Sequence, residues 1–108
     1  MWRIILVRKE DLMRQYELVA IFPLEEDQYK AGKETVLADL TAQGTEILKT
    51  DEIGDKDLAY EINKRKRGRY LLFTLKAEPA KITTLDRVFK LNANLLRYLF
   101  VKVEEQHG

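Results

Sequence analysis

The chain has 108 residues, 45% of them hydrophobic, and a formal net charge of +1 at pH 7. This length predicts one domain with one core. The absence of cysteine excludes disulfides and thiolate chemistry, and no apolar run approaches the roughly 20 residues of a membrane span. A protein that binds nucleic acid through its overall charge is usually more basic, so contact with a polyanion would depend on local clusters of cations.

The first twelve residues are considered apart from a domain predicted over residues 13–103. Their apolar stretch, residues 4–7, is short and lacks a small-residue cleavage site, which argues against a secretory signal. This stretch could form a β-strand. Met13 could equally be the start of the protein, which would make residues 1–12 an N-terminal extension or an artefact of the assigned start. Residues 104–108 are predicted to be a short, frayed polar tail.

Taken in chain order, alternating residues predict a first strand over residues 16–22, which Pro23 ends. Acidic residues then open a helix over residues 25–43, because the helix dipole favours negative charge at its start. Gly44 is placed to cap the end of this helix. Its apolar stripe consists of Tyr29, Val36, Leu37 and Leu40.

A second strand is predicted over residues 45–53, with Gly54 at a bulge or bend. A run from 45 to 63 would be long for one straight strand. Residues 64–69 contain five cations in six positions and are predicted to form the tip of a hairpin. In this tip Gly68 would supply a positive φ angle.

The third strand is predicted over residues 70–77. Pro79 then opens a second helix, and a final strand follows over residues 95–103. The stripe of the second helix consists of Ile82, Leu85, Val88 and Phe89. The order β-α-β-β-α-β predicts the α+β, ferredoxin-like class, with a four-stranded antiparallel sheet and two helices on one face.

The second face of this sheet also carries apolar side chains, although a solvated face normally alternates to polar residues. Scattered exposed apolar residues are normal, so one interpretation gives this face no role. The other is a contiguous patch that is covered by another protein, by residues 1–12 or by bases. The residues concerned are Val19, Ile21, Tyr70, Leu72, Leu99 and Val101.

Little in the sequence favours catalysis. The single histidine, His107, lies one residue from the end, whereas a general base needs a fixed position. Serine is absent, which excludes a Ser-His-Asp triad, and a usual zinc site is not expected without cysteine or a second histidine. We therefore predict that the protein is not an enzyme and holds no metal or cofactor.

The run of cations is the strongest functional signal: Lys64, Arg65, Lys66, Arg67 and Arg69. Charge runs are usually solvated turns. Five neighbouring cations repel one another, however, and a phosphate backbone would relieve that repulsion by releasing its counterions. This favours contact with RNA. Base stacking is not expected, because Tyr70 and Phe73 are three residues apart and face opposite sides of their strand.

Several motifs in order resemble a known family. Residues 13–17, Met-Arg-Gln-Tyr-Glu, resemble the Met-Arg-x-Tyr-Glu opening of bacterial small-subunit ribosomal protein S-six. The pattern Gly54-x-x-x-Leu58-Ala59-Tyr60-x-Ile62, a basic turn and Gly68-x-Tyr70 are similar to its central signature. The match extends from Met13 to about Val103. Three positions depart from the family: Asp55 and Asp57 replace frequent basic residues, and Glu61 stands where proline is usual.

The resemblance implies a structural constituent of the small ribosomal subunit in the cytoplasm. It would bind the central domain of small-subunit ribosomal RNA together with ribosomal protein S-eighteen. Arg14 and the run of cations would contact phosphates, and Asp55 and Asp57 would favour a basic protein partner instead. The partner surface would use the second strand, the hairpin and an open-face set consisting of Val19, Ile21, Tyr70, Leu72, Arg97, Leu99 and Val101.

Two alternatives share the topology. A regulatory or small-ligand-binding module would be supported by a glycine-rich ligand loop, and none is visible in the sequence. An acylphosphatase-like enzyme would need an arginine-bearing phosphate cradle after the first strand. Residues 23–26 are acidic at that position, Pro-Leu-Glu-Glu, which disfavours an anion site.

Overall fold

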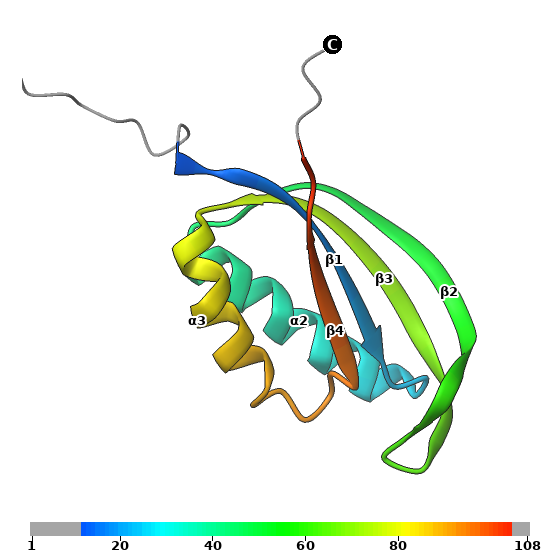
Figure 1. Ribbon diagram of the computed structural model, residues 1–108. Helices are drawn as coiled ribbons and strands as arrows, with labels where there is room; N and C mark the ends of the chain where they lie inside the picture. Colours follow the sequence, from blue (N-terminus) through cyan, green and yellow to red (C-terminus); the bar gives the residue numbers. More distant parts are fainter. Residues whose placement is uncertain (1–11, 105–108) are drawn as a thin grey trace, which may run out of the picture.

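A computed structural model describes residues 12–104 of the chain. It contains six elements in the predicted order (Figure 1), and both the predicted extension, except its last residue, and His107 lie outside the described residues. The elements are β1 (Arg14–Phe22), α2 (Glu26–Ala42), β2 (Glu46–Ile62), β3 (Arg65–Ala77), α3 (Pro79–Phe89) and β4 (Arg97–Lys102).

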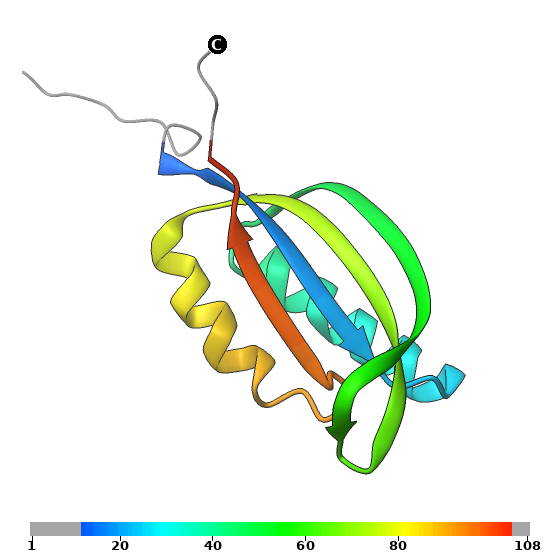
Figure 2. The ribbon, with the colours of Figure 1, turned by 45° about the vertical axis from the view of Figure 1, so that its right-hand side comes forward.

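The strands form one antiparallel sheet in the order β2-β3-β1-β4, and both helices pack on the same face of it (Figures 1 and 2). This confirms the predicted ferredoxin-like class. None of the helices in residues 12–104 has the length and apolar character needed to cross a membrane.

The core lies between the helices and the sheet, where the predicted stripes and strand faces meet. Alternate residues of β1 and β3 point into it, and the two helices contribute one stripe each. Its fully buried side chains include Leu18, Phe22, Val36, Leu40, Leu71, Phe73, Leu75, Leu85 and Phe89. The residues between them on the strands face away from the helices and form the open face of the sheet.

Strand β2 is longer than predicted. It runs continuously over 17 residues, and its pairing with β3 is interrupted by irregularities at Ile47/Lys49, Glu52/Gly54 and Asp57/Ile62. These extra residues let a long strand curve with the sheet. Gly54 lies at the second irregularity with a φ of +107°, which confirms the predicted bend.

The predicted hairpin tip was placed wrongly. The turn consists of Asn63 and Lys64, with φ angles of +50° and +64°, and β3 already begins at Arg65. A two-residue turn with positive φ at both positions matches the twist of paired strands, and asparagine tolerates that conformation well. Four of the five cations therefore lie along a strand.

Gly68 was expected to supply the turn, and that prediction was also wrong. It is a buried residue of β3 paired with Lys56. A Cβ atom at this position would lie 2.5 Å from Cγ2 of Ile21 and 3.4 Å from the carbonyl oxygen of Phe22. Glycine is needed here because β3 packs too closely against its neighbours for a side chain.

Candidate functional site

The cations of β3 divide between the two faces of the sheet. Arg65 and Arg69 contact the start of α2 on the helix side, and alternation places Arg67 on that side as well. The same alternation places Lys66 on the open side, while Lys64 lies in the turn. The sequence brings these cations together, but strand geometry separates them.

Arg65 is anchored by residues that precede it by about forty positions. Its Nη1 lies 2.6 Å from Oε2 of Glu25, and its Nη2 donates a hydrogen bond of 2.9 Å to Oε1 of Gln28. The backbone of Glu25 and the Arg65 guanidinium both lower the pKa of the Glu25 carboxyl. The acids at the start of α2 therefore do more than favour the helix dipole, because they also neutralise cations of β3.

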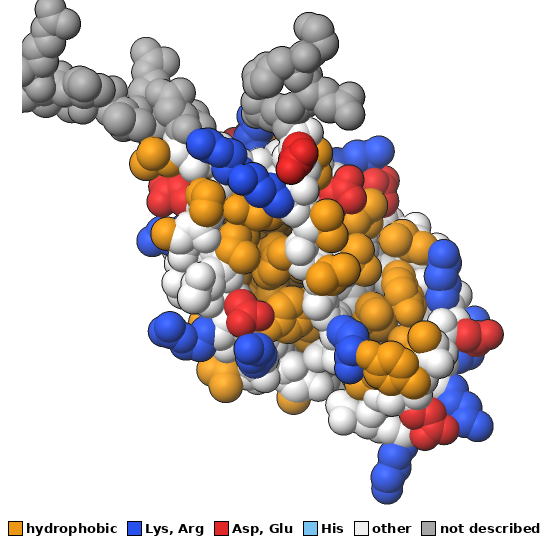
Figure 3. Space-filling model, viewed as in Figure 1, with side chains coloured by type: hydrophobic (Ala, Val, Ile, Leu, Met, Phe, Trp, Pro, Cys, Tyr) orange, Lys and Arg blue, Asp and Glu red, His pale blue; other side chains and the backbone are white. Residues whose placement is uncertain are grey.

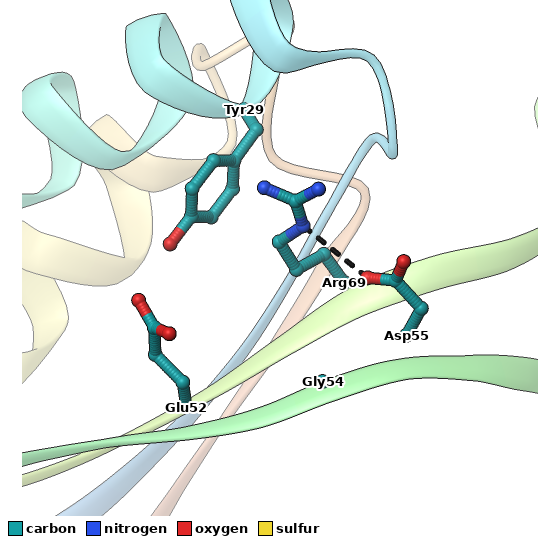
Figure 4. A pocket seen from close by; sticks show the side chains of 5 residues that line it. All are labelled: Tyr29, Glu52, Gly54, Asp55 and Arg69. Atoms are coloured by element: carbon teal, nitrogen blue, oxygen red, sulfur yellow. Dashed lines mark hydrogen bonds and ion pairs between the residues drawn. The ribbon is translucent and has the colours of Figure 1, made fainter.

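Arg69 is held still more closely, as Figure 4 shows. Its guanidinium lies 4.2 Å from the ring centroid of Tyr29, and it pairs with Glu26 and Asp55, each at 3.2 Å. Burial disfavours the charged form, but the hydrogen bonds with Glu26 and Asp55 outweigh it and raise the pKa of Arg69. Only 25% of this side chain is exposed.

The remaining cations face solvent. Arg67 pairs with Asp57 at 3.2 Å, and both side chains are more than half exposed, so this ion pair contributes little stability. Lys64 and Lys66 are exposed, and no ion pair involves either of them within residues 12–104. Of the five cations in the run, Lys64, Lys66 and Arg67 therefore have side chains that extend into solvent.

Arg14 lies at the far end of the sheet from the run of cations. It is paired with Ala77, at the end of β3 opposite to the hairpin, and its Nη1 donates a hydrogen bond to the carbonyl oxygen of Met13. Twelve residues of strand separate Arg65 from Ala77, which corresponds to about 40 Å. The structure does not bring Arg14 together with the other predicted RNA contacts.

The seven predicted partner residues do come together on the open face. In the register of the sheet, Val19 lies between Leu72 and Leu99, and Ile21 lies between Tyr70 and Arg97. Val101 follows Leu99 by two residues on the same face of β4 and is paired with Glu17 of β1. Figure 3 shows hydrophobic side chains gathered over the strands on this side. The seven residues, called the open-face patch below, are contiguous.

The end of the β2–β3 hairpin bends over this patch. Arg97 donates a hydrogen bond to the hydroxyl of Tyr60, and its guanidinium lies 4.9 Å from the ring centroid of Tyr60. These residues belong to opposite edges of the sheet, β4 and β2, so the contact requires the hairpin to cross the open face (Figure 2). Ile21, beneath the hairpin, is only 8% exposed.

Two hollows of the surface lie on different sides of the sheet. One, of about 390 Å³, belongs to the open-face patch and is lined by Val19, Ile21, Arg97, Tyr98 and Leu99. The other, of about 310 Å³, lies between α2 and β2 and is lined by Tyr29, Glu52, Gly54, Asp55 and Arg69 (Figure 4). Sequence reasoning missed the second hollow, because its residues come from three separate segments. Residues 12–104 contain no cluster of three or more side chains suited to a metal ion.

Comparisons with known proteins agree on one family. The family model described as Ribosomal protein S6 matches residues 15–102. The small ribosomal subunit protein bS6 of Treponema denticola is 48% identical over 93 residues, which cover 86% of this chain and all of the relative. That of Treponema pallidum strain Nichols is 45% identical over 92 residues, covering 85% of this chain and 99% of the relative.

Solved structures agree on the fold. The crystal structure of 30S ribosomal protein S6 from Thermotoga maritima superposes with a TM-score of 0.75 at 20% identity, covering 84% of this chain and 88% of that one. The C-terminal domain of the MgtC protein from Mycobacterium tuberculosis reaches 0.59 at 10% identity, with 90% and 95% covered. The same topology thus occurs in proteins with unrelated names.

Proposed function

This chain belongs to the ribosomal protein S6 family, and from that premise we propose that it is a structural constituent of the small ribosomal subunit. It binds ribosomal RNA there together with ribosomal protein S-eighteen, and it works in the cytoplasm, on the ribosome. The observation that carries the proposal is the family match over residues 15–102, which includes almost every residue of the sheet and both helices.

The proposed RNA contacts are the solvated cations at the hairpin end. Lys64, Lys66 and Arg67 extend into solvent, where each can displace counterions from a phosphate backbone. Arg65 and Arg69 remain close enough to contribute to the local potential, but they also hold the hairpin against α2. Arg14 would contact a separate stretch of RNA, because it lies at the other end of the sheet.

The proposed protein partner covers the open-face patch. Leu99 and Val101 are 60% and 44% exposed, and an apolar patch that spans neighbouring strands is typical of an interaction surface. With a net charge of only +1, the chain does not need to neutralise RNA alone, since a basic partner supplies further cations. Nothing in the residues described supports catalysis. The alternative of a regulatory or small-ligand-binding module was based on shared topology alone, and the family match favours the ribosomal role over it.

The RNA contact predicts a change in the salt dependence of binding. Replacing both Lys64 and Lys66 by glutamine should lower the slope of log K against log salt by about 1 to 2, for a fragment of the central domain of the ribosomal RNA. A filter-binding titration over a range of salt, with S-eighteen present, measures the slope. The matched control replaces Lys30 and Lys81 on the helices. Equal slopes for both double variants would show that the hairpin end does not contact the RNA.

The protein contact predicts a loss of affinity for S-eighteen. Leu99→Asp places a charge in the open-face patch and should weaken binding by about tenfold or more, because the carboxylate loses its hydration when the partner covers it. Isothermal titration calorimetry measures the affinity. Leu91→Asp is the control, since Leu91 is 82% exposed and lies outside the sheet. If both variants bind alike, the partner does not use this face.

A further inference from the structure

The hollow between α2 and β2 has no role in the proposed function so far. It lies on the helix side of the sheet, whereas the open-face patch lies on the other side. Its walls come from the start of α2, from the bulge of β2 at Gly54 and from β3. At Gly54 a Cβ atom would meet no other atom within 4 Å, so the β2 side of the hollow is open to an incoming group.

The hydroxyl of Tyr29 has no hydrogen-bond partner among the described residues, although Tyr29 is only 6% exposed. Its ring, in contrast, has close contacts. The ring packs edge-on against Phe22, with 5.6 Å between the centroids, and the Arg69 guanidinium lies 4.2 Å from its centroid. Figure 4 shows the hydroxyl pointing across the hollow toward the Glu52 carboxylate. The hydroxyl oxygen itself reaches the surface of the hollow, so it is available to bond a group that enters there.

The charge around the hollow is negative. Three carboxylates surround it, from Glu26, Glu52 and Asp55, against the two cations Arg69 and Lys33, so one negative charge is in excess. Arg69 already pairs with Glu26 and Asp55, and no ion pair involves Glu52 within residues 12–104. An added anion would meet a guanidinium already paired with two carboxylates, whereas an added cation would find a carboxylate outside any ion pair.

We propose that this hollow binds the guanidinium of an arginine side chain from a basic partner protein. The Glu52 carboxylate accepts two of its N–H groups in the planar arrangement that guanidinium and carboxylate share, and the Tyr29 hydroxyl accepts another. The chain already holds one guanidinium in this environment, that of Arg69. The inference rests on the proposed function, in which a basic protein shares the docking on RNA.

The position of β2 makes the hollow accessible to a polypeptide. Within residues 12–104, strand β2 is an edge of the sheet and pairs only with β3. An extended segment of a partner can therefore lie alongside it and direct one side chain into the hollow. Asp55 and Asp57 belong to this edge. Both are acidic, so they add negative charge along the edge at which the partner segment would lie.

The first test uses the intact chain and N-acetylarginine amide as the probe, with N-acetylglutamine amide as the uncharged comparison. Titration followed by NMR should shift the Gly54 amide and the Tyr29 ring with the arginine probe only. Glu52→Gln should weaken this binding about fivefold or more, and Tyr29→Phe about twofold to threefold, because the latter keeps the ring and removes only the hydroxyl. Glu46→Gln, an exposed acid near the other end of β2, should change nothing.

Three results would overturn the inference: no shift at Gly54 and Tyr29, equal shifts with the glutamine probe, or equal affinities for Glu52→Gln and Glu46→Gln. A second measurement separates its failure from that of the proposed function. If S-eighteen binds Glu52→Gln as well as the parent chain but binds Leu99→Asp weakly, the open-face contact stands and the arginine site is wrong. If S-eighteen does not bind at all, the proposed partner is wrong, and the NMR titration still decides the chemistry of the hollow.

Discussion

At the scale of single residues, Tyr98 shows how one side chain joins two elements. Its hydroxyl lies 2.6 Å from Oδ1 of Asp86 and 2.9 Å from the Asp86 carbonyl oxygen, and its ring packs edge-on against Phe89 at 5.4 Å. Burial and the Asp86 hydrogen bond raise the pKa of Tyr98 from the usual 10.0 to about 12. The edge strand β4 is thereby tied to α3.

This tie predicts a loss of stability at alkaline pH. The folded pKa of Tyr98 exceeds the unfolded value, so its contribution is complete below pH 10 and is lost as pH rises from 10 toward 12. Tyr98→Phe should be less stable than the parent at pH 8, and the difference should shrink by pH 11. Urea unfolding followed by circular dichroism at both pH values measures this. Tyr60→Phe, an exposed tyrosine, is the control, and a parallel decline for all three proteins would contradict the assignment.

At the scale of elements, the hairpin of β2 and β3 is held from both of its faces. Arg65 and Arg69 attach it to the start of α2 on the helix side. On the other side, Tyr60 reaches Arg97 across the open face. The hairpin end is therefore ordered by contacts with distant segments as well as by its own turn, and it forms one wall of the open-face patch.

The Tyr60–Arg97 contact predicts local rather than global effects. Tyr60→Ala should increase amide hydrogen exchange in residues 58–66 and leave the free energy of unfolding within about 0.5 kcal/mol of the parent value, because Tyr60 is 58% exposed. Exchange measured by mass spectrometry checks this. Tyr60→Phe retains the stacked ring and should show a smaller increase. An unchanged exchange rate would mean that the turn alone orders the hairpin end.

At the scale of the whole molecule, one core supports two sheet faces with different tasks. The helix face supplies stability, because the fully buried side chains of the core lie there. The open face carries apolar groups that remain partly exposed, including Leu99 and Val101. A single domain of this size can leave one sheet face available for a partner because two helices on the other face already provide its core.

This difference between the two faces predicts that truncating an apolar side chain lowers the free energy of unfolding much more on the helix face than on the open face. Phe73→Ala should lower the free energy of unfolding by about 3 to 5 kcal/mol, since Phe73 is fully buried. Leu99→Ala should lower it by less than about 1 kcal/mol, because most of that side chain already faces solvent. Chemical denaturation of the two variants gives both values. A similar loss of unfolding free energy in both variants would show that the open face belongs to the core.

Much of the candidate site was predictable from the way side chains alternate between the two faces of a strand. The seven residues of the open-face patch were assigned to one side of the sheet because neighbouring strand residues face opposite ways. The register then made them contiguous, which no pattern along the chain could establish. The run of cations was visible as a cluster, yet the partners of Arg65 and Arg69 come from α2 and its start, about forty residues earlier.

The sequence by itself determined the order and type of the elements, the stripes of both helices and the inward faces of the strands. These properties arise from periodicities of two and 3.6 residues, which are local and can be read along the chain. Only the tertiary structure decided where the hairpin turns, why Gly68 is a glycine and which cations remain in solvent. The last two depend on contacts between segments distant in sequence, such as Gly68 with Ile21 or Arg69 with Tyr29, and such contacts exist only once the chain has packed.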